Sequence, residues 1–541
     1  MNIKVSAKVF VFWVLLTSLG WAQKGKSTTM SLVENPKPSK VVNIVDSTDY
    51  NKAKIIFNKL VSARGDLRLP VPKFEMTGTS NWVAYMDYDA GEIAIENKAY
   101  DVTASFGDNQ DAAIAFLLGH ELTHYYEKHA WKKGFASEYR DLDIGLKIDT
   151  TQDDVANETQ ADYLGGFLAY TAGYGIFDRG PELIAALYKK YNLPDKLKKY
   201  PSLSDRQKIT SRTRDKLKDL VRVFELANML TVTSNYTAAS RCYENILKTY
   251  QSREIYNNLG TAILLDAMQY FTVTELKYVY PIQLDLSTNA QNGLANIRTK
   301  QIREALLRFE SALSLDPDYL PAYLNKACAY ALLGDTSRAR FYCSVEARQR
   351  AEQKSDSLTL GKIEVLEGIL EAQAGREDNA RKLFERSASR GNFIALSNLN
   401  TINKQPPPVI SEGRATAKTE KIDNLSLQSL IAENRFPNLK STPIESGINC
   451  NVVDGAWAGS FVLMYEQDDA TTYFLATKPG YSMATAKGIK LGAGIKDVTS
   501  QYGDPKSSIL TPNGLIMAYS NLLFIFDSNN KLKQWMIYKT T

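Results

Sequence analysis

Cysteine is scarce in this 541-residue sequence, which contains four. A disulfide-dense scaffold is therefore excluded, and the fold depends on hydrophobic cores. Two of the cysteines, Cys328 and Cys343, fall on successive helices of one expected hairpin, where an oxidising compartment could join them. The alternative, which we expect, is single buried thiols. The full set is Cys242, Cys328, Cys343 and Cys450.

Long apolar runs are absent beyond the N-terminus, where Lys4 and Lys8 precede an apolar run at residues 9–16. Small residues at Gly20 and Ala22 suit cleavage before Gln23, so residues 1–22 are predicted to be a signal peptide. No cysteine stands directly after the cleavage position, which argues against a lipoprotein anchor, and an uncleaved anchor is the alternative. No later stretch reaches the roughly 18 residues of a membrane span. We expect an exported protein without a transmembrane span, either periplasmic or secreted.

A strong charge of one sign is also lacking, because 65 basic residues face 60 acidic ones. No basic stripe indicates nucleic acid. The length exceeds what one core supports and predicts several domains.

All three histidines, His120, His124 and His129, lie within ten residues, and the first two belong to the motif His120-Glu121-Leu122-Thr123-His124. On a helix, residues four apart share a face, so His120 and His124 can bind one ion with Glu121 alongside. A catalytic zinc takes three protein ligands and keeps a fourth position for water.

The third ligand is predicted from a second motif, Glu158-Thr159-Gln160-Ala161-Asp162. Glu158 is the natural third ligand, and Asp162, one helical turn later, can accept the far N–H of a ligand histidine. Two histidines four apart around a glutamate also occur by chance on structural helices. The clustering of a rare residue together with the second motif favours the metal site, which we expect to hold one Zn2+.

His129 competes for the third position. The metzincin spacing requires glycine at position 127 and histidine at position 130, where this chain has Glu127 and Ala130. His129 is five residues beyond His124, about 140 degrees away on a helix. We expect it to cap the helix end or to face solvent.

These two motifs resemble the HExxH and ExxAD motifs of gluzincin peptidases related to the CaaX prenyl proteases. The resemblance covers roughly residues 50–215, and a histidine five residues after the first motif is also usual in that family. It implies a mostly helical zincin fold with zinc on His120, His124 and Glu158, and peptide hydrolysis. It further implies that residues 91–96, Gly-Glu-Ile-Ala-Ile-Glu, form an edge strand along which an extended substrate lies.

One segment departs from the family pattern. Family members often carry His-Pro followed by an arginine, whereas this chain has Tyr200-Pro201 and, further on, Arg206. Tyr200 would stabilise the oxyanion, occupy the open zinc position, or be a simple loop aromatic. These three alternatives remain open.

The middle of the chain carries a tetratricopeptide pattern. Ala305 and Ala339 are 34 residues apart, one full period, with Phe309 and Pro317 at repeat positions between them. The pattern recurs at Gly368, Gly375, Ala380 and Phe384, and Leu259-Gly260 suggests a further copy upstream. We expect an array at residues 222–400 whose concave face binds proteins or peptides, with a core separate from that of the metal region.

The C-terminal part has a different pattern. Residues 401–425 contain Pro406-Pro407-Pro408 and are predicted to be a linker. Residues 444–541 are predicted to form a small α/β docking module, with strands at 515–519, 522–526 and 532–538 and a short helix through Ile495, Val498 and Tyr502.

The sequence thus predicts an α+β, mostly α protein with a metallopeptidase domain at residues 45–215, the array and the C-terminal module. We expect an exported zinc endopeptidase of protein substrates, with Glu121 as general base and selection of substrate by the array. Envelope protein quality control is a fitting role. The alternative is a latent protease that acts as a repeat-based scaffold or chaperone.

Overall fold

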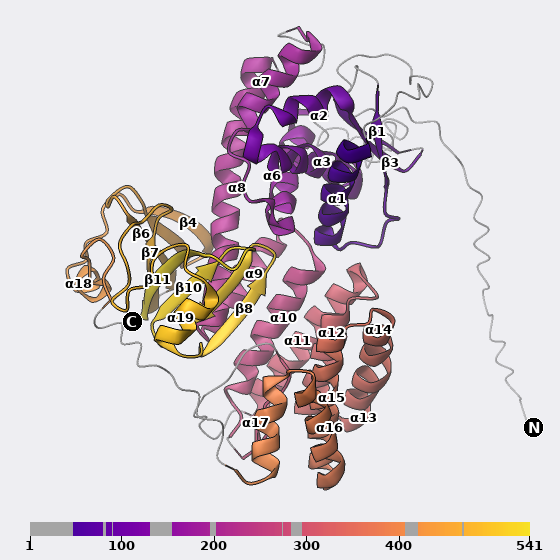
Figure 1. Ribbon diagram of the computed structural model, residues 1–541, viewed down its shortest axis with the longest axis vertical. Coiled ribbons are helices and arrows are strands. Elements are labelled where there is room, and N and C mark those ends of the chain that lie inside the picture. Colours follow the sequence, from indigo (N-terminus) through magenta and orange to yellow (C-terminus); the bar gives the residue numbers. More distant parts are fainter. Residues whose placement is uncertain are drawn as a thin grey trace, which may run out of the picture.

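The computed structural model describes residues 47–78, 83–88, 90–129, 154–194, 202–272, 274–282, 295–405, 420–467 and 470–541. The fold is α+β with helix predominating. In Figure 1 the N-terminal helices lie at the top, a helical array lies below them, and a C-terminal sheet lies beside α8 and α9. The predicted signal peptide, Tyr200 and most of the predicted linker lie outside the described residues.

The N-terminal region combines a three-stranded sheet with a group of helices. The sheet consists of β1 (Lys73–Thr77), β2 (Ala84–Asp87) and β3 (Glu92–Glu96). The helical elements are α1 (Ser47–Arg64), α2 (Asn97–Ala104), η1 (Gly107–Asn109), α3 (Gln110–Tyr126), α6 (Asp154–Ala169), the π-helical turn η2 (Tyr170–Tyr174) and α7 (Gly180–Tyr191).

The expected edge strand at residues 91–96 is wrong. The strand order is β1-β3-β2, so β3 is the central strand, paired in parallel with β1 and antiparallel with β2. Its residues 93–96 are buried, as expected for a strand covered on both faces. The outer strands among the described residues are β1 and β2, and of these β2 contacts α3.

The array consists of helical hairpins. Its helices are α9 (Tyr236–Leu247), α10 (Arg253–Met268), α11 (Ala295–Leu315), α12 (Leu320–Leu332), α13 (Thr336–Arg340), the π-helical η3 (Phe341–Ala347), α14 (Arg348–Gln353), α15 (Ser357–Gln373), α16 (Glu377–Ser389) and α17 (Phe393–Ile402). A Cβ on Gly260 would lie 2.7 Å from the Phe309 ring, and one on Gly368 would lie 2.5 Å from the Phe384 ring. The two hairpins therefore pack by the same glycine-to-phenylalanine contact.

This contact corrects the predicted repeat boundaries. Gly260 and Phe309 belong to the same hairpin, α10 with α11, although they are 49 positions apart. Gly368 and Phe384 are 16 positions apart. Gly260 is thus not part of a separate upstream copy. One repeat carries an insertion between its two helices.

Helix α8 (Leu203–Val232) joins the N-terminal region to the array. It packs on α6, α7 and α9. One continuous core, rather than the separate cores expected, runs from Ala53 through the array. Backbone contacts reinforce this junction, because Leu67 N–H donates to the Leu315 carbonyl at 2.7 Å.

The C-terminal module is larger than predicted. Its eight-stranded sheet has the order β4-β5-β6-β7-β11-β10-β9-β8. The elements are α18 (Leu427–Ala432), β4 (Lys440–Glu445), β5 (Ile448–Val453), β6 (Ser460–Gln467), β7 (Ala470–Thr477), α19 (Ile495–Tyr502), β8 (Ser507–Thr511), β9 (Gly514–Ala518), β10 (Leu522–Phe526) and β11 (Leu532–Thr540).

The predicted start at residue 444 falls inside β4, and strands β4 to β8 were not predicted. One face of the sheet joins the core of the array, and the other packs on α18 and α19 around the fully buried Trp535. Burial on both faces removes much of the alternation by which strands are predicted.

All four cysteines are buried and unpaired, as the single-thiol alternative states. Among the described helices, none is both long and apolar enough to cross a membrane.

Candidate metal centre

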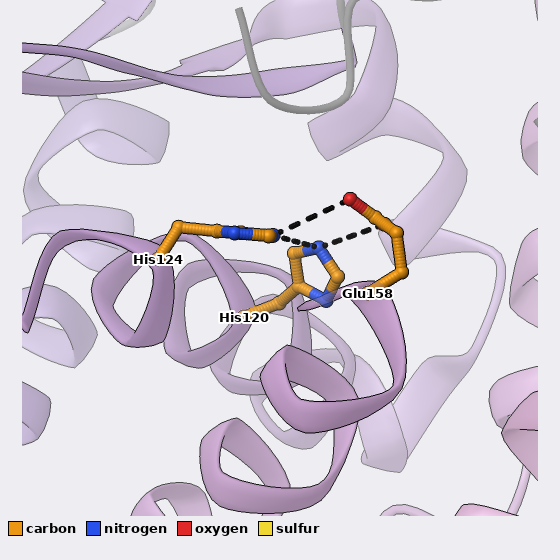
Figure 2. A group of neighbouring side chains, drawn as sticks. All are labelled: His120, His124 and Glu158. Atoms are coloured by element: carbon orange, nitrogen blue, oxygen red, sulfur yellow. Dashed lines mark hydrogen bonds and ion pairs between the residues drawn. The ribbon is translucent and has the colours of Figure 1, made fainter. Parts of the chain in front are cut away.

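Three predicted side chains converge between α3 and α6. The ligand-type atoms of His120, His124 and Glu158 all lie within 4.8 Å of one another, and all three residues are buried (Figure 2). The two histidines lie on the same face of α3, as their spacing of four predicts. Glu158 lies on α6 and faces them.

The distances between these atoms suit a tetrahedral ion. His120 Nε2 lies 3.0 Å from His124 Nε2 and 3.4 Å from Glu158 Oε2, and His124 Nε2 lies 3.5 Å from Glu158 Oε1. Zinc bound at about 2.0–2.1 Å in a tetrahedron separates its ligand atoms by about 3.3 Å. The donor set of two imidazoles and a carboxylate is also one that zinc prefers.

Glu158 has the charge state that a metal ligand needs. Burial opposes ionisation, but the hydrogen bond with His120 and the charges of the two histidines and Arg206 lower the pKa of Glu158 to about 2. The carboxylate is thus ionised at neutral pH, and its two oxygens face the two histidines.

Asp162 anchors the ring of His120. His120 Nδ1 donates to Asp162 Oδ1 at 2.9 Å, the contact that the spacing of four on α6 predicts. This bond leaves Nε2, on the opposite side of the ring, with its lone pair toward Glu158 and His124.

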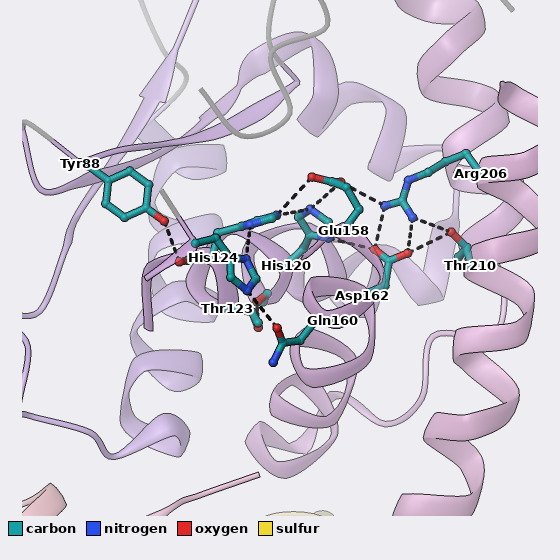
Figure 3. A network of polar contacts seen from close by, with 11 residues as sticks. Tyr88, His120, Thr123, His124, Glu158, Gln160, Asp162, Arg206 and Thr210 are labelled. Atoms are coloured by element: carbon teal, nitrogen blue, oxygen red, sulfur yellow. Dashed lines mark hydrogen bonds and ion pairs between the residues drawn. The ribbon is translucent and has the colours of Figure 1, made fainter. Parts of the chain in front are cut away.

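Arg206 holds Asp162 in turn, which sequence reasoning missed. Its guanidinium is buried and bidentate, with Nη1 2.5 Å from Asp162 Oδ2 and Nη2 2.9 Å from Oδ1 (Figure 3). Thr210, one turn later on α8, donates from Oγ1 to Asp162 Oδ2 at 3.1 Å. The arginine charge and the hydrogen bonds hold the pKa of Asp162 below its usual range despite its burial.

The expected surface position of His129 is wrong. His129 is buried, and its Nδ1 lies 2.7 Å from His124 Nδ1. Its Nε2 lies 3.0 Å from Oε1 of Gln160, which α6 supplies between Glu158 and Asp162. His129 therefore supports His124 from the side opposite Nε2, much as Asp162 supports His120.

Glu121 lies beside this cluster and is fully buried. Both of its carboxylate oxygens lack a hydrogen-bond partner among the described residues. Burial is the main cause that raises the pKa of Glu121 to about 8, and the nearby His120 partly offsets it. A buried carboxyl group without a protein partner is costly, so its retention indicates a role in binding or chemistry.

Two glycines bring the helices together. A Cβ on Gly165 of α6 would lie 2.6 Å from the carbonyl carbon of Gly119 and 2.7 Å from the amide nitrogen of His120. The backbones of α3 and α6 thus touch directly beside the first histidine. This close approach lets Glu158 and Asp162 reach the histidine face.

Strand β2 lies beside the centre on the α3 side. Tyr88, directly after β2, donates from its hydroxyl to the His124 carbonyl at 2.6 Å (Figure 3). No described strand pairs with the outer edge of β2. Tyr200 lies outside the described residues, and its three alternative roles remain predictions.

Comparison with known proteins identifies the repeats. No protein-family model matches the chain. The chain is 28% identical over 114 residues to tetratricopeptide repeat protein 36 of Xenopus tropicalis. This match covers 21% of this chain and 54% of the relative. It is 33% identical over 113 residues to the Homo sapiens protein of the same name, covering 20% of this chain and 57% of the relative.

The Bos taurus protein of that name is 30% identical over 141 residues, which covers 26% of this chain and 69% of the relative. The chain therefore belongs to the tetratricopeptide repeat proteins, as the predicted array indicates. It spans somewhat more than half the length of the frog and human relatives.

Proposed function

We propose that the chain is an exported zinc-dependent peptidase that hydrolyses peptide bonds of protein substrates. The observation that carries this proposal is the buried carboxylate of Glu121. It has no hydrogen-bond partner among the described residues and lies beside three convergent ligand-type side chains. A purely structural metal site has no use for such a group. The N-terminal pattern of Lys4, Lys8 and the apolar run supports export.

His120, His124 and Glu158 would hold the zinc. When bound, zinc would supply Lewis-acid activation of water and of the scissile carbonyl. Asp162 and Arg206 fix the ring of His120, and His129 with Gln160 fixes the ring of His124. These contacts preset the ligand geometry and so reduce the cost of binding.

Glu121 would carry the proton. Its carboxylate accepts a proton from the attacking water and then delivers that proton to the departing amine, so one side chain serves both steps. Glu121 must be ionised to accept that proton, and the positive charge of a bound zinc would favour the ionised form.

Strand β2 would bind the substrate main chain. It is an outer strand of the described sheet, and Tyr88 ties its end to the helix of the two histidines. An extended peptide added to this edge would lie along α3. Strand β2 thus replaces β3, the strand at residues 91–96, in the expected role of binding an extended substrate.

The test is a Glu121→Gln variant of the full chain with an unfolded, fluorescein-labelled casein. The amide cannot act as a base, so we expect hydrolysis to fall by roughly 100- to 10,000-fold while zinc content is unchanged. A variant that still cleaves at the wild-type rate would refute the role of Glu121.

A repeat-based scaffold is the second candidate function, and the tetratricopeptide relatives favour it. In that case the array binds protein partners and the metal centre contributes structure alone. Cleavage would then be absent from the wild-type chain, and a Glu121→Gln variant would retain every partner.

A further inference from the structure

A cavity of about 620 Å³ lies where the three parts of the chain meet. Its walls come from the first helices of successive hairpins, from the ends of α1 and η2, and from residues 509–513 of the C-terminal module. The metal-centre residues do not line it. It is therefore a site distinct from the one described above.

One wall is the free edge of β8. This strand is the last in the sheet order, and no described strand pairs with its outer side. Three consecutive residues of β8, Ile509, Leu510 and Thr511, line the cavity. Side chains alternate between the two faces of a strand, so consecutive residues can line one cavity when the strand presents its edge to it. An unpaired edge offers main-chain N–H and C=O groups to an extended peptide.

Side-chain amides from α10 and α12 also line the cavity. Asn325 Nδ2 donates to Asn257 Oδ1 and to Thr261 Oγ1, each at 3.1 Å. Asn257 Nδ2 and Asn325 Oδ1 then have no partner among the described residues, and neither does the amide of Asn258. An available donor and an available acceptor on the same wall match the two polar groups of a peptide unit.

The charges on the walls favour an acidic ligand. Lys362 of α15 lines the cavity and forms no ion pair among the described residues, although the carboxylate of Asp356 acts on its charge from further away. Glu254, the carboxylate on the cavity wall, is paired with Arg253 at 2.7 Å. Burial lowers the pKa of Lys362, and the charge of Asp356 offsets this effect only in part. The side chain of Leu510 is 82% exposed and offers the apolar contact.

We propose that this cavity binds an extended peptide segment whose main chain adds to the edge of β8 and is read by Asn257, Asn258 and Asn325. An acidic side chain of the segment pairs with Lys362, and an aliphatic one packs on Leu510.

The cavity also reaches the helix that carries Glu158. Thr171 of η2 lines it and lies 13 positions after Glu158, which corresponds to about 20 Å of helix. An extended chain needs about six residues to cover that distance. This step rests on the proposed function: the cavity would hold a substrate about six residues or more from the bond that is cut.

The test is fluorescence anisotropy with full-length protein that carries Glu121→Gln, so that the probe stays intact. The probe is a fluorescein-labelled, C-terminally amidated dodecapeptide of threonine, serine and leucine with two central aspartates. Two comparison peptides carry N-methyl groups at alternate residues or asparagine in place of aspartate.

We expect Leu510→Asp and Asn258→Leu each to weaken binding by about tenfold or more. Lys362→Gln should remove the preference for aspartate over asparagine, and N-methylation should abolish binding. The matched controls are Leu307→Asp, at a leucine 66% exposed outside the cavity, and Lys382→Gln on the exposed side of α16. Both controls should bind as the parent does.

The proposal would be overturned if the N-methylated peptide bound as tightly as the unmethylated probe. It would also be overturned if Leu510→Asp and Leu307→Asp bound the probe with equal affinity. Binding is measured in the Glu121→Gln protein without turnover. If that protein binds as expected while the wild-type chain hydrolyses nothing, the peptidase function would be refuted and this site would stand.

Discussion

Gly119 of α3 and Gly165 of α6 meet backbone to backbone, with space for no side chain between them. On α3, His120 directly follows Gly119, and on α6, Asp162 lies three residues before Gly165. The contact between the two glycines therefore sets the distance across which His120, His124 and Glu158 converge.

A Gly165→Ala substitution should force the two helices apart. The added methyl group would collide with the backbone at Gly119 and His120, which cannot move as a flexible side chain would. We expect a loss of about 1–3 kcal/mol in the free energy of unfolding, measured in urea, and weaker zinc binding by calorimetry. Gly361→Ala is the control, because an added Cβ there meets its nearest atom at an ordinary 3.5 Å. Unchanged zinc affinity in Gly165→Ala would show that the helix contact does not set the ligand geometry.

The three ligand-type residues should be individually necessary for metal retention. We expect the purified chain to hold one zinc, and His120→Ala, His124→Ala and Glu158→Ala each to hold none, because two remaining ligands are too few for a stable site. Metal analysis by mass spectrometry measures this directly. Full zinc in Glu158→Ala would refute the assignment of the third ligand.

Arg206 should matter through Asp162. Removal of the guanidinium in Arg206→Ala leaves a buried carboxylate without its main partner, so we expect a loss of about 3–5 kcal/mol in unfolding free energy. Zinc affinity should fall by roughly 10- to 100-fold in Asp162→Ala, as for other residues that orient a ligand. In Arg206→Lys, both the free energy of unfolding and the zinc affinity should stay close to those of Arg206→Ala, since an ammonium group cannot match the bidentate contact. Wild-type zinc affinity in Arg206→Ala would contradict this chain of contacts.

The sequence predicts the ligand set because its parts are local. His120 and His124 are one helical turn apart, as are Glu158 and Asp162, and helical geometry alone aligns each pair. Arg206 is 44 positions from Asp162, and Gly119 is 46 positions from Gly165. Nothing in the periodicity of either segment joins such distant residues, so these contacts emerge from the tertiary fold.

The same limit explains the errors in the fold. The edge position of residues 91–96 is what the family resemblance implies, and the six-residue pattern itself fits an edge or a central strand equally well because it does not encode the pairing partners. The single repeat that contains Gly260 and Phe309 was divided in two because the insertion hides its period.

The array should show a pH-dependent contribution from Glu371, which links two hairpins through Arg340 at 2.9 Å and also pairs with Arg376. The hydrogen bond from Arg376, followed by that from Arg340, lowers the pKa of Glu371 from 4.5 to about 2. Its stabilising contribution is therefore fully present above about pH 4.5 and is lost as the pH falls toward 2. In urea unfolding, the free energy of unfolding of Glu371→Gln should be lower than that of wild type near neutral pH, and this difference should vanish near pH 2. The exposed Glu385→Gln should show no such difference at either pH, and an equal effect of both substitutions would contradict the prediction.

The most direct test of the central claim is a zinc titration of the chelator-stripped full chain, with hydrolysis of unfolded, labelled casein as the readout. The account predicts no hydrolysis without metal, a rise to a plateau at about one equivalent of zinc, and no rise in Glu121→Gln although it binds the same equivalent. Hydrolysis that persists in the stripped protein, or wild-type hydrolysis by Glu121→Gln, would contradict it.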